Sequence, residues 1–366
     1  MDLAALPLVD HHVHGARRDD LTRAEFEDAI TESDRPVPAW MTTFDSPLGF
    51  AIRRWCAPVL DLRPHADPGA YLTRRQELGA AEVNRRFLAA SGVRHFLVET
   101  GFRAAELLDP AGMAEASGAV AGEVVRLESV AEELTDVAAA DFSIRYAERL
   151  AERTGTAVGL KTVVAYRYGL DFDPARPSAT EVTEAAGRWL GAGGGRLADP
   201  VLLRHVIWAG VDRGLPLQIH TGFGDPDLRL HRADPLLLTR FLELVERHGV
   251  PVLLLHCYPF HRHAAYLAQA YPHVFFDVGL TLNYVGAAAS TVLAEALELA
   301  PFAKMLYSSD AFGPAELHYL GAELWRRALG TVLGERVASG DWSAADAQRV
   351  AEMIGYRNAR RVYALD

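Results

Sequence analysis

Cysteine is nearly absent from this chain, whose 366 residues include only Cys56 and Cys257. The two lie far apart and form no CxxC pair, so one disulfide is formally possible, but a reduced chain is favoured. The N-terminus has no basic flank, and Leu3 to Val9 is too short for the apolar core of a secretion signal. We therefore expect a reduced, cytoplasmic protein.

Positive charge is also scarce, with 37 Lys and Arg against 48 Asp and Glu and a formal net charge of −11. Phosphate backbones require clustered basic residues, and the basic pairs here never grow into a patch, which argues against a nucleic-acid partner. No run approaches the ~18 uninterrupted apolar residues of a membrane span. Half of the residues are hydrophobic and 23% are charged, which is typical of a globular enzyme. A small-molecule substrate is expected, and homo-oligomer formation is left open.

Eight short runs of apolar or β-branched residues are distributed along the chain. They are Leu8 to His14, His95 to Gly101, Val124 to Val130, Ala157 to Tyr166, Pro216 to Gly222, Val252 to Pro259, Val274 to Leu280 and Lys304 to Ala311. Between most of them lie stretches with helical periodicity, such as 139–154, 199–213 and 235–248. This alternation predicts an α/β fold with a parallel sheet. Eight units favour a closed (β/α)8 TIM barrel, although a doubly wound open sheet would also alternate.

The chain between the first two runs is long. It contains a helix candidate over 22–33, a Pro-rich piece and a second helix candidate over 71–91. Connections of this length are usually functional or form a subdomain. We interpret residues 15–80 as a helical cap-like insertion in a single domain spanning 1–366. Arg53 and Arg54, in GFAIRRW, are candidates to reach down from it. The chain after Asp310 reads as mostly helical, over 315–333 and 344–365.

Unusual polar residues fall in or at the ends of the predicted strands, and this placement favours the barrel, where such ends converge on one face. They are His12, His14, Glu99, Glu128, Lys161, His220, His256, Asp277 and Asp310. Glu99 and Glu128 could bind a cationic group or pair with Lys161.

The first strand ends in DHHVH, Asp10 to His14. His12 and His14 project to the same side because they are two residues apart on a strand, and two imidazoles on one strand form half of a zinc-type site. The alternative to a metal site is that one of these histidines caps a backbone carbonyl and the other faces solvent. Alternation points His11 away from the interior. Asp10 points inward, either as an acceptor for a ligand N–H or as a strand-bottom polar residue.

Three further residues, His220, His256 and Asp310, each follow apolar residues that would place them at the barrel mouth. Burying several imidazoles and a carboxylate together without a cation would leave polar groups poorly paired, at about a few kcal/mol each. The pattern therefore predicts a bound metal.

In this pattern the chain resembles the amidohydrolase superfamily, which carries HxH on strand one, His on strands five and six, and Asp on strand eight. The phrases GLKTVVAYR, QIHTGFGD, LLHCYPF and YSSDA resemble the amidohydrolase-type domain that precedes a glutamine-synthetase-like domain in some fungal and plant proteins. The sequence ends at Asp366, so we expect only the hydrolase-like domain.

The resemblance implies that His12, His14, His220 and Asp310 bind one divalent metal, Zn²⁺ or another such as Mn²⁺ or Fe²⁺. Asp310 would be the catalytic proton acceptor. His256, the other catalytic residue, would orient the water or polarise the substrate carbonyl, unless it ligates a second metal. Lys161 decides that alternative, because a fourth-strand lysine is carbamylated and bridges two metals in some branches. Otherwise it anchors a substrate carboxylate or forms an ion pair.

Candidates for substrate binding are Lys161, Tyr166, Arg167, Asp225 and Tyr258, which lie at or just beyond strand ends. Arg suits bidentate carboxylate recognition, with a surface salt bridge as the alternative for Arg167. His261 and His263 are expected on a surface helix.

The resemblance implies metal-dependent hydrolysis of a C–N bond, such as an amide or γ-glutamyl amide. The alternatives are a metal-dependent nonoxidative decarboxylase or other lyase, and a scaffold without catalysis.

Overall fold

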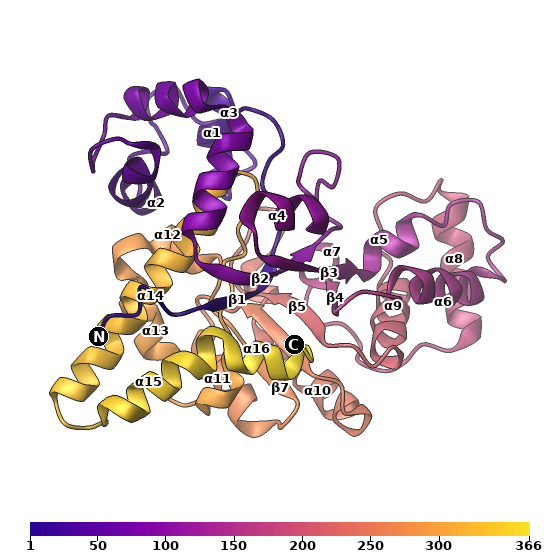
Figure 1. Ribbon diagram of the computed structural model, residues 1–366. Helices are drawn as coiled ribbons and strands as arrows, with labels where there is room; N and C mark the ends of the chain where they lie inside the picture. Colours follow the sequence, from indigo (N-terminus) through magenta and orange to yellow (C-terminus); the bar gives the residue numbers. More distant parts are fainter. The chain divides into compact units, whose positions relative to one another are not determined.

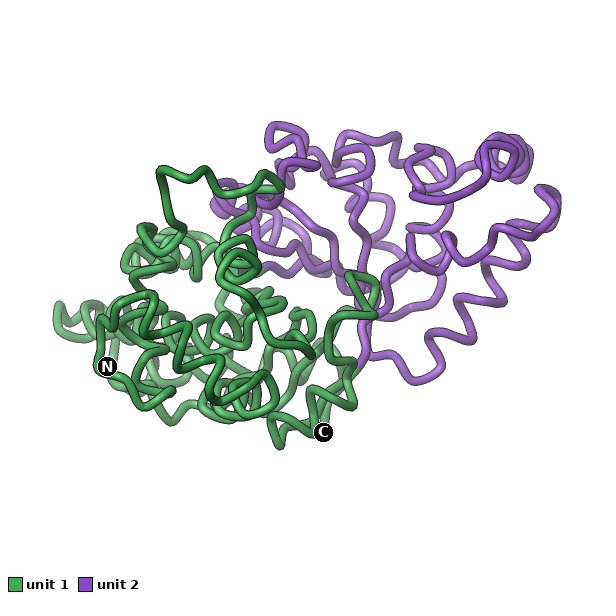
Figure 2. Tube along the Cα trace, turned by 90° about the horizontal axis from the view of Figure 1, so that it is seen from above, with its two compact units in different colours: residues 1–122, 277–366 green, residues 123–276 purple.

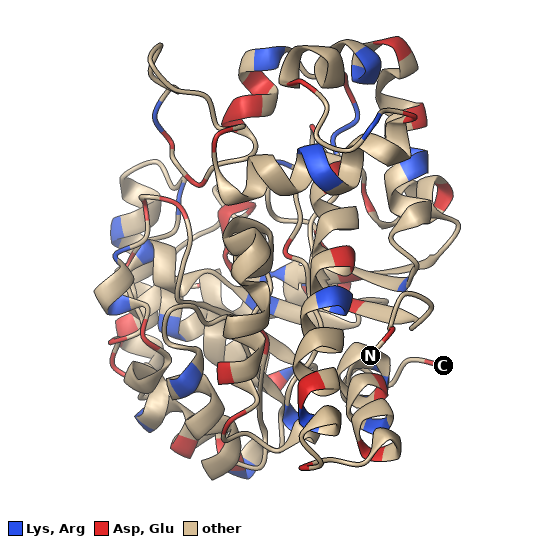
Figure 3. Ribbon diagram, turned by 90° about the vertical axis from the view of Figure 1, so that its left-hand side faces the viewer, with Lys and Arg blue, Asp and Glu red and all other residues tan.

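The computed structural model describes residues 1–366 and divides them into two compact units. The first comprises Met1–Gly122 and Asp277–Asp366, and the second comprises Glu123–Phe276 (Figure 2). None of the helices combines the length and apolar character that a membrane crossing requires. Figure 3 shows acidic and basic residues interspersed along the helices.

The first unit contains two paired strands and most of the helices. Its elements are β1 (Leu8–Val13), α1 (Arg23–Asp28), α2 (Pro47–Ala51), the π-helix η1 (Ile52–Cys56), η2 (Ala57–Leu60), α3 (Pro68–Ala90), β2 (Val93–Glu99), α4 (Pro110–Ser117), α12 (Thr281–Val285), η6 (Gly286–Ala288), α13 (Ala289–Ala296), η7 (Phe302–Lys304), α14 (Ala315–Ala338), α15 (Ala344–Glu352), the π-helix η8 (Met353–Arg357) and α16 (Asn358–Val362). β1 and β2 pair in parallel. β1, at the indigo end of Figure 1, packs against α16, at its yellow end.

The second unit is built on a parallel sheet in which β3 to β7 follow one another in chain order. Its elements are β3 (Val120–Arg126, from Glu123 on), α5 (Leu127–Glu132), α6 (Phe142–Arg153), β4 (Gly159–Thr162), α7 (Val164–Arg167), α8 (Ala179–Gly191), α9 (Pro200–Asp212), β5 (Leu217–Thr221), η3 (Leu230–Arg232), η4 (Pro235–Leu238), α10 (Thr239–Val245), η5 (Glu246–His248), β6 (Val252–His256), α11 (His261–Ala270) and β7 (Val274–Phe276). β4, β5 and β6 are buried throughout, as the near-continuous hydrophobic runs predicted.

The eighth predicted strand, Lys304 to Ala311, is not a regular strand. Its backbone nevertheless lies along β1, because His11 N–H donates to Tyr307 O, Asp310 N–H donates to His12 O and His14 N–H donates to Ala311 O. Asp310 adopts a left-handed φ of 49°, which interrupts the extended geometry. The parallel α/β fold is confirmed with seven strands, and the closed eight-stranded barrel stays a prediction.

Helix ends follow local signals, as α1 illustrates. Thr22 caps it in a capping box with Glu25. α3 covers the helix predicted over 71–91 but contains a kink at Gly79, whose φ is 75°. A residue with a side chain would be strained at this angle. Residues 15–80 thus contain α1, α2, η1, η2 and the start of α3, and their interpretation as a cap stays a prediction.

Three sequence assignments were wrong in detail. The run Val124 to Val130 was expected to be one strand, but β3 ends at Arg126 and α5 follows. The run Ala157 to Tyr166 contains only the short β4 and then turns into α7. The helix predicted over 235–248 is divided into η4, α10 and η5.

Candidate metal centre

The first unit brings His12, His14 and Asp310 together. His12 Nε2 lies 2.9 Å from Asp310 Oδ1, and His14 Nε2 lies 3.6 Å from the same oxygen. The two imidazole rings are 5.4 Å apart, as expected for residues that share one side of β1. Two imidazole nitrogens and a carboxylate oxygen at these separations form a donor set that suits Zn²⁺. The residues present therefore fit a divalent metal.

Asp310 is held in its position by strained backbone and by Asp10. Its left-handed φ of 49° is uncommon for a residue with a side chain, and such strain clusters at functional sites. The neighbouring Ser309 donates from its backbone N–H (2.9 Å) and its hydroxyl (2.5 Å) to the Asp10 carboxyl. Burial raises the pKa of Asp10 to about 8. Asp10 therefore has neither of the two roles expected for it. Its carboxyl fixes Ser309, and with it the segment that carries Asp310.

Glu99, at the end of β2, orients His14. Its Oε2 lies 3.1 Å from His14 Nδ1, and its Oε1 accepts the Gly101 N–H at 2.7 Å. The same nitrogen donates to the Glu99 backbone O at 3.2 Å, and the carboxylate beside it adds a negative charge that favours the proton on Nδ1. Nε2 is left with its lone pair, which faces Asp310. The sequence placed Glu99 at a strand end but gave it a different role. The sequence feature that could have indicated this contact is that Glu99 ends β2, the strand that pairs with β1.

His11 points away from this cluster, which confirms its predicted orientation. Its Nε2 lies 2.9 Å from Asp277 Oδ2, and its Nδ1 lies 3.1 Å from the Tyr363 hydroxyl. His11 and Asp277 are fully buried. Asp277 was expected at the barrel mouth, but it forms a buried pair with His11. His318, which was not singled out, contacts His14 O through Nε2 at 3.0 Å.

The second unit brings together His220, from β5, and His256, from the end of β6. Their ring centroids are 4.5 Å apart, and the Tyr166 ring lies 4.4 Å from that of His220. His220 Nε2 is 3.1 Å from Phe223 O. His256 has a left-handed φ of 67°, so it carries the same kind of backbone strain as Asp310 in the first unit.

The loop after β5 depends on glycine. A Cβ on Gly224 would collide with the Tyr166 hydroxyl and lie 3.2 Å from His220 Nε2. Only glycine allows this close approach of backbone to the two side chains. The GFG of QIHTGFGD therefore has a direct steric reason next to His220.

The remaining predicted residues of the second unit lie in different surroundings. Lys161 is buried in β4. Tyr166 and Arg167 belong to α7 and do not end a strand. Arg167 pairs with Glu132 at 2.9 Å, so a salt bridge is present, but the Arg167 side chain is only 9% exposed and the pair does not lie on the surface as expected. Asp225 lies in the loop after β5. Their roles in substrate binding stay predictions.

Tyr258 stacks on His261, with ring centroids 5.8 Å apart and an interplanar angle of 3°. Both His261 and His263 lie on α11, as predicted. The surface expectation was wrong for His261, which is buried and stacks on the Tyr258 ring, whereas the His263 side chain is 46% exposed.

Glu128 is a further correction, since it lies in the first turn of α5 and not on a strand. Its carboxyl accepts the Thr162 hydroxyl at 2.5 Å and the Val163 N–H at 3.0 Å. Burial raises the pKa of this carboxyl. Glu128 thus holds the end of β4.

Comparison with known proteins identifies the family of this chain. The family model described as Amidohydrolase matches residues 108–365. Protein fluG of Emericella nidulans is 31% identical over 246 residues, which are 62% of this chain and 27% of that protein. The chain thus spans about a quarter of the length of this relative.

Two solved structures are similar to this chain. A protein from Lactobacillus casei ATCC 334, assigned as a metal-dependent hydrolase, is 27% identical with a TM-score of 0.87, covering 99% of this chain and 97% of that one. A TIM-barrel protein of uncharacterised function from Bordetella bronchiseptica is 14% identical with a TM-score of 0.50 over 98% and 99% of the two chains, which shows a shared fold. Because the family model covers well over half of the residues, the chain belongs to the amidohydrolase family.

Proposed function

We propose that this protein is a metal-dependent hydrolase that cleaves a C–N bond in a small polar molecule. The observation that carries the proposal is the cluster of His12, His14 and Asp310 with Glu99 on the second nitrogen of His14. A histidine whose Nδ1 faces a backbone oxygen and a buried carboxylate, as that of His14 faces Glu99, presents Nε2 as a ligand. Family membership supports the same reaction class.

The proposed ligands are His12, His14 and Asp310, with His220 as the fourth, assigned from the family pattern in the sequence. One ion per chain is expected, and imidazole and carboxylate donors suit Zn²⁺ and also accept Mn²⁺ or Fe²⁺. When bound, such an ion lowers the pKa of a water molecule towards about 7.

The protein's own residues would move the protons. Asp310 accepts the proton of the attacking water through its carboxylate and returns it to the leaving amine as the C–N bond breaks. His256 orients that water or polarises the substrate carbonyl. Lys161, Tyr166, Arg167, Asp225 and Tyr258 are proposed to contact the substrate. For Arg167 this would require the guanidinium to serve the substrate while it pairs with Glu132.

An amide of the γ-glutamyl type is the first substrate class to test, because the resemblance in sequence is to domains joined to glutamine-synthetase-like partners. Nonoxidative decarboxylation or another lyase reaction is the alternative, since the same ligands serve both. Buried Lys161 favours a substrate with a carboxylate in either case.

The test combines metal analysis with a substrate screen. We expect about one divalent ion per chain, with activity lost in His12→Ala and Asp310→Asn. His231→Ala is the matched control because His231 is exposed on η3. A panel of N-acyl and γ-glutamyl amides, with aromatic carboxylates beside them, should release amine or ammonia. Release of CO₂ alone would establish the lyase, and absence of metal with both variants unaffected would refute the proposal.

A further inference from the structure

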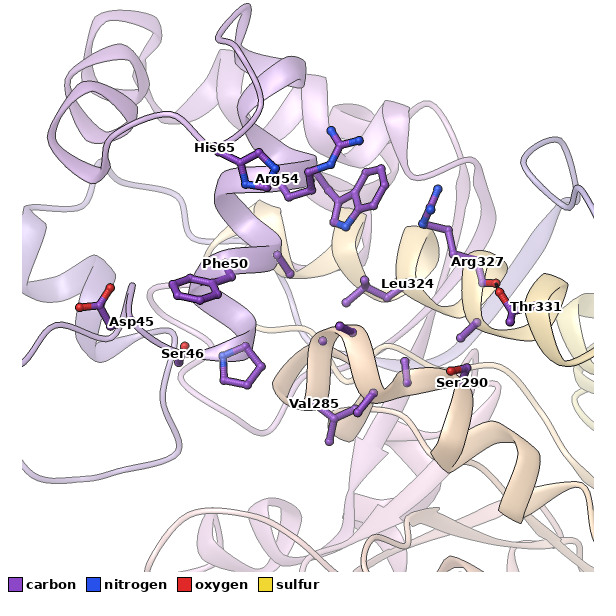
Figure 4. Close-up of a pocket in the computed structure, with 18 residues that line it drawn as sticks. Asp45, Ser46, Phe50, Arg54, His65, Val285, Ser290, Leu324, Arg327 and Thr331 are labelled. Atoms are coloured by element: carbon purple, nitrogen blue, oxygen red, sulfur yellow. Dashed lines mark hydrogen bonds between the residues drawn. The ribbon is translucent and has the colours of Figure 1, made fainter.

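A cavity lies entirely within the first unit, and none of the residues assigned to the metal or the substrate lines it. It has a volume of about 840 Å³, within the ~300–1,000 Å³ range of small-molecule pockets. Figure 4 shows Phe50 and Arg54 on one wall, Leu324 and Arg327 on α14, and Val285 and Ser290 below. We call this cavity the Trp55 groove, after the indole between its two arginines.

Two guanidinium groups meet on the Trp55 ring. The Arg54 guanidinium carbon lies 4.3 Å from the ring centroid and that of Arg327 lies 4.0 Å from it. Arg327 has one carboxylate neighbour, Glu323, at 3.8 Å, whereas Arg54 forms no ion pair with a carboxylate. Two like charges on one indole repel each other. In a chain of net charge −11, this is a local site for an anion.

The rest of the groove is apolar and open. The Phe50 side chain is 56% exposed, and Leu324 and Ala328 of α14 face the same space. The wall formed by Gly286 to Ala289 carries only small residues, so no side chain from this wall extends into the cavity. The Phe50 ring and these aliphatic side chains give the groove an apolar lining beside its two arginines.

The arginine wall is built by a π-helix. η1 spans Ile52–Cys56, and its widened turn closes with the Ala57 N–H donating to Ile52 O. Single π-turns are rare and are frequently found at functional sites. Arg53, the other arginine of this turn, is occupied because it donates to Ala66 O and His65 O. Within this turn Arg53 is therefore bound to the backbone, whereas Arg54 lines the groove.

We propose that the Trp55 groove binds a small amphipathic carboxylate, a second ligand site distinct from the catalytic one. The guanidinium groups of Arg54 and Arg327, which both lie against the Trp55 indole, attract the carboxylate, and the alkyl or aryl body covers Phe50 and Leu324. Asp45 lies at the end of the groove opposite Arg327 (Figure 4), so a ligand with one anionic end is favoured over a dicarboxylate. The proposal does not rest on the hydrolase reaction.

Decanoate is the probe, titrated into the full chain by isothermal calorimetry, with decyltrimethylammonium as the probe of opposite charge. We expect saturable binding of decanoate at one site and none of the cation. Arg54→Gln and Arg327→Gln should each weaken binding about tenfold, as loss of a charged hydrogen-bond partner does. Arg349→Gln, an exposed arginine of α15 outside the groove, should bind like the wild type.

A second variant tests the cavity itself. Ala288 is exposed on η6 and lines the groove, so Ala288→Trp should fill the space without disturbing the core and abolish decanoate binding. Unchanged thermal unfolding shows that the variant is folded. Absence of saturable binding, equal binding of the cation, or full affinity in both arginine variants would each overturn the proposal. The last outcome would assign the carboxylate to the catalytic metal.

Discussion

Replacing Glu99 by Gln tests how the first unit prepares His14 for a metal. The substitution keeps the size of the side chain and an oxygen for the Gly101 N–H, which now donates to Glu99 Oε1 at 2.7 Å. It changes the group that faces His14 Nδ1 at 3.1 Å from a carboxylate oxygen to an amide. The Glu99 backbone O still accepts from Nδ1 at 3.2 Å in the variant, so what is lost is the negative charge that makes His14 a stronger ligand through Nε2, the atom that faces Asp310.

The expected result is a metal affinity lower by about 10- to 100-fold, the usual effect of losing a carboxylate behind a histidine ligand. This is about 1.4 to 2.8 kcal/mol of binding free energy. The Glu99 side chain is fully buried, so solvent cannot replace the lost charge. Affinity is measured by competition with a chromogenic zinc chelator at constant pH.

Glu106→Gln is the matched control, because Glu106 follows the same strand and pairs with Arg17 and Arg103 on a partly exposed surface. It should bind metal as the wild type does. If Glu99→Gln is folded and also keeps full affinity, the carboxylate does not strengthen His14 as a ligand. If the wild type itself binds no metal, the fault lies in the proposed function and not in the role of Glu99.

Three further predictions concern stability and metal number. Arg75→Met should destabilise the protein by about 3–5 kcal/mol, because Arg75 pairs with Glu316 at 3.0 Å in the buried interior. Arg74→Met, on the exposed surface, is the control and should change stability by at most about 1 kcal/mol. Urea unfolding measures the free energy of unfolding of both variants. Burial lowers the pKa of His205 to about 4, so the unfolded chain takes up a proton as pH falls below 6.5 while the folded chain does not. Between pH 7 and 5 the wild type should lose about 2 kcal/mol more than His205→Asn. Lys161→Ala should lower activity and leave one metal per chain; a fall from two metals to one would establish a binuclear site.

The order of elements was predictable from sequence because it rests on local periodicity. Seven of the eight runs contain strands, and the helices predicted over 139–154 and 199–213 are observed as α6 and α9. The HxH pair was predictable for the same reason, since alternation along a strand fixes which residues share a face. His12, His14 and Asp310 were grouped in advance, and the structure places them together.

The ends of elements were less predictable because distant residues decide them. β4 stops at Thr162 although the apolar run continues to Tyr166, since the Glu128 carboxyl accepts both the Thr162 hydroxyl and the Val163 N–H. The local sequence of β4 does not indicate this contact, because Glu128 lies far away in the sequence. The eighth run likewise read as a strand, but the left-handed backbone at Asp310 interrupts it.

Pairs of charged residues show the limit most directly. Glu99 and Glu128 carry the same side chain and were given the same expectations from sequence, yet one faces His14 at the candidate metal centre and the other closes a strand. Burial opposes the ionised form of both, and only the partner differs. Burial raises the pKa of Glu128, although the Thr162 hydroxyl that it accepts opposes the shift. The role of each carboxyl is therefore set by contacts across more than thirty residues of sequence, which periodicity cannot reveal.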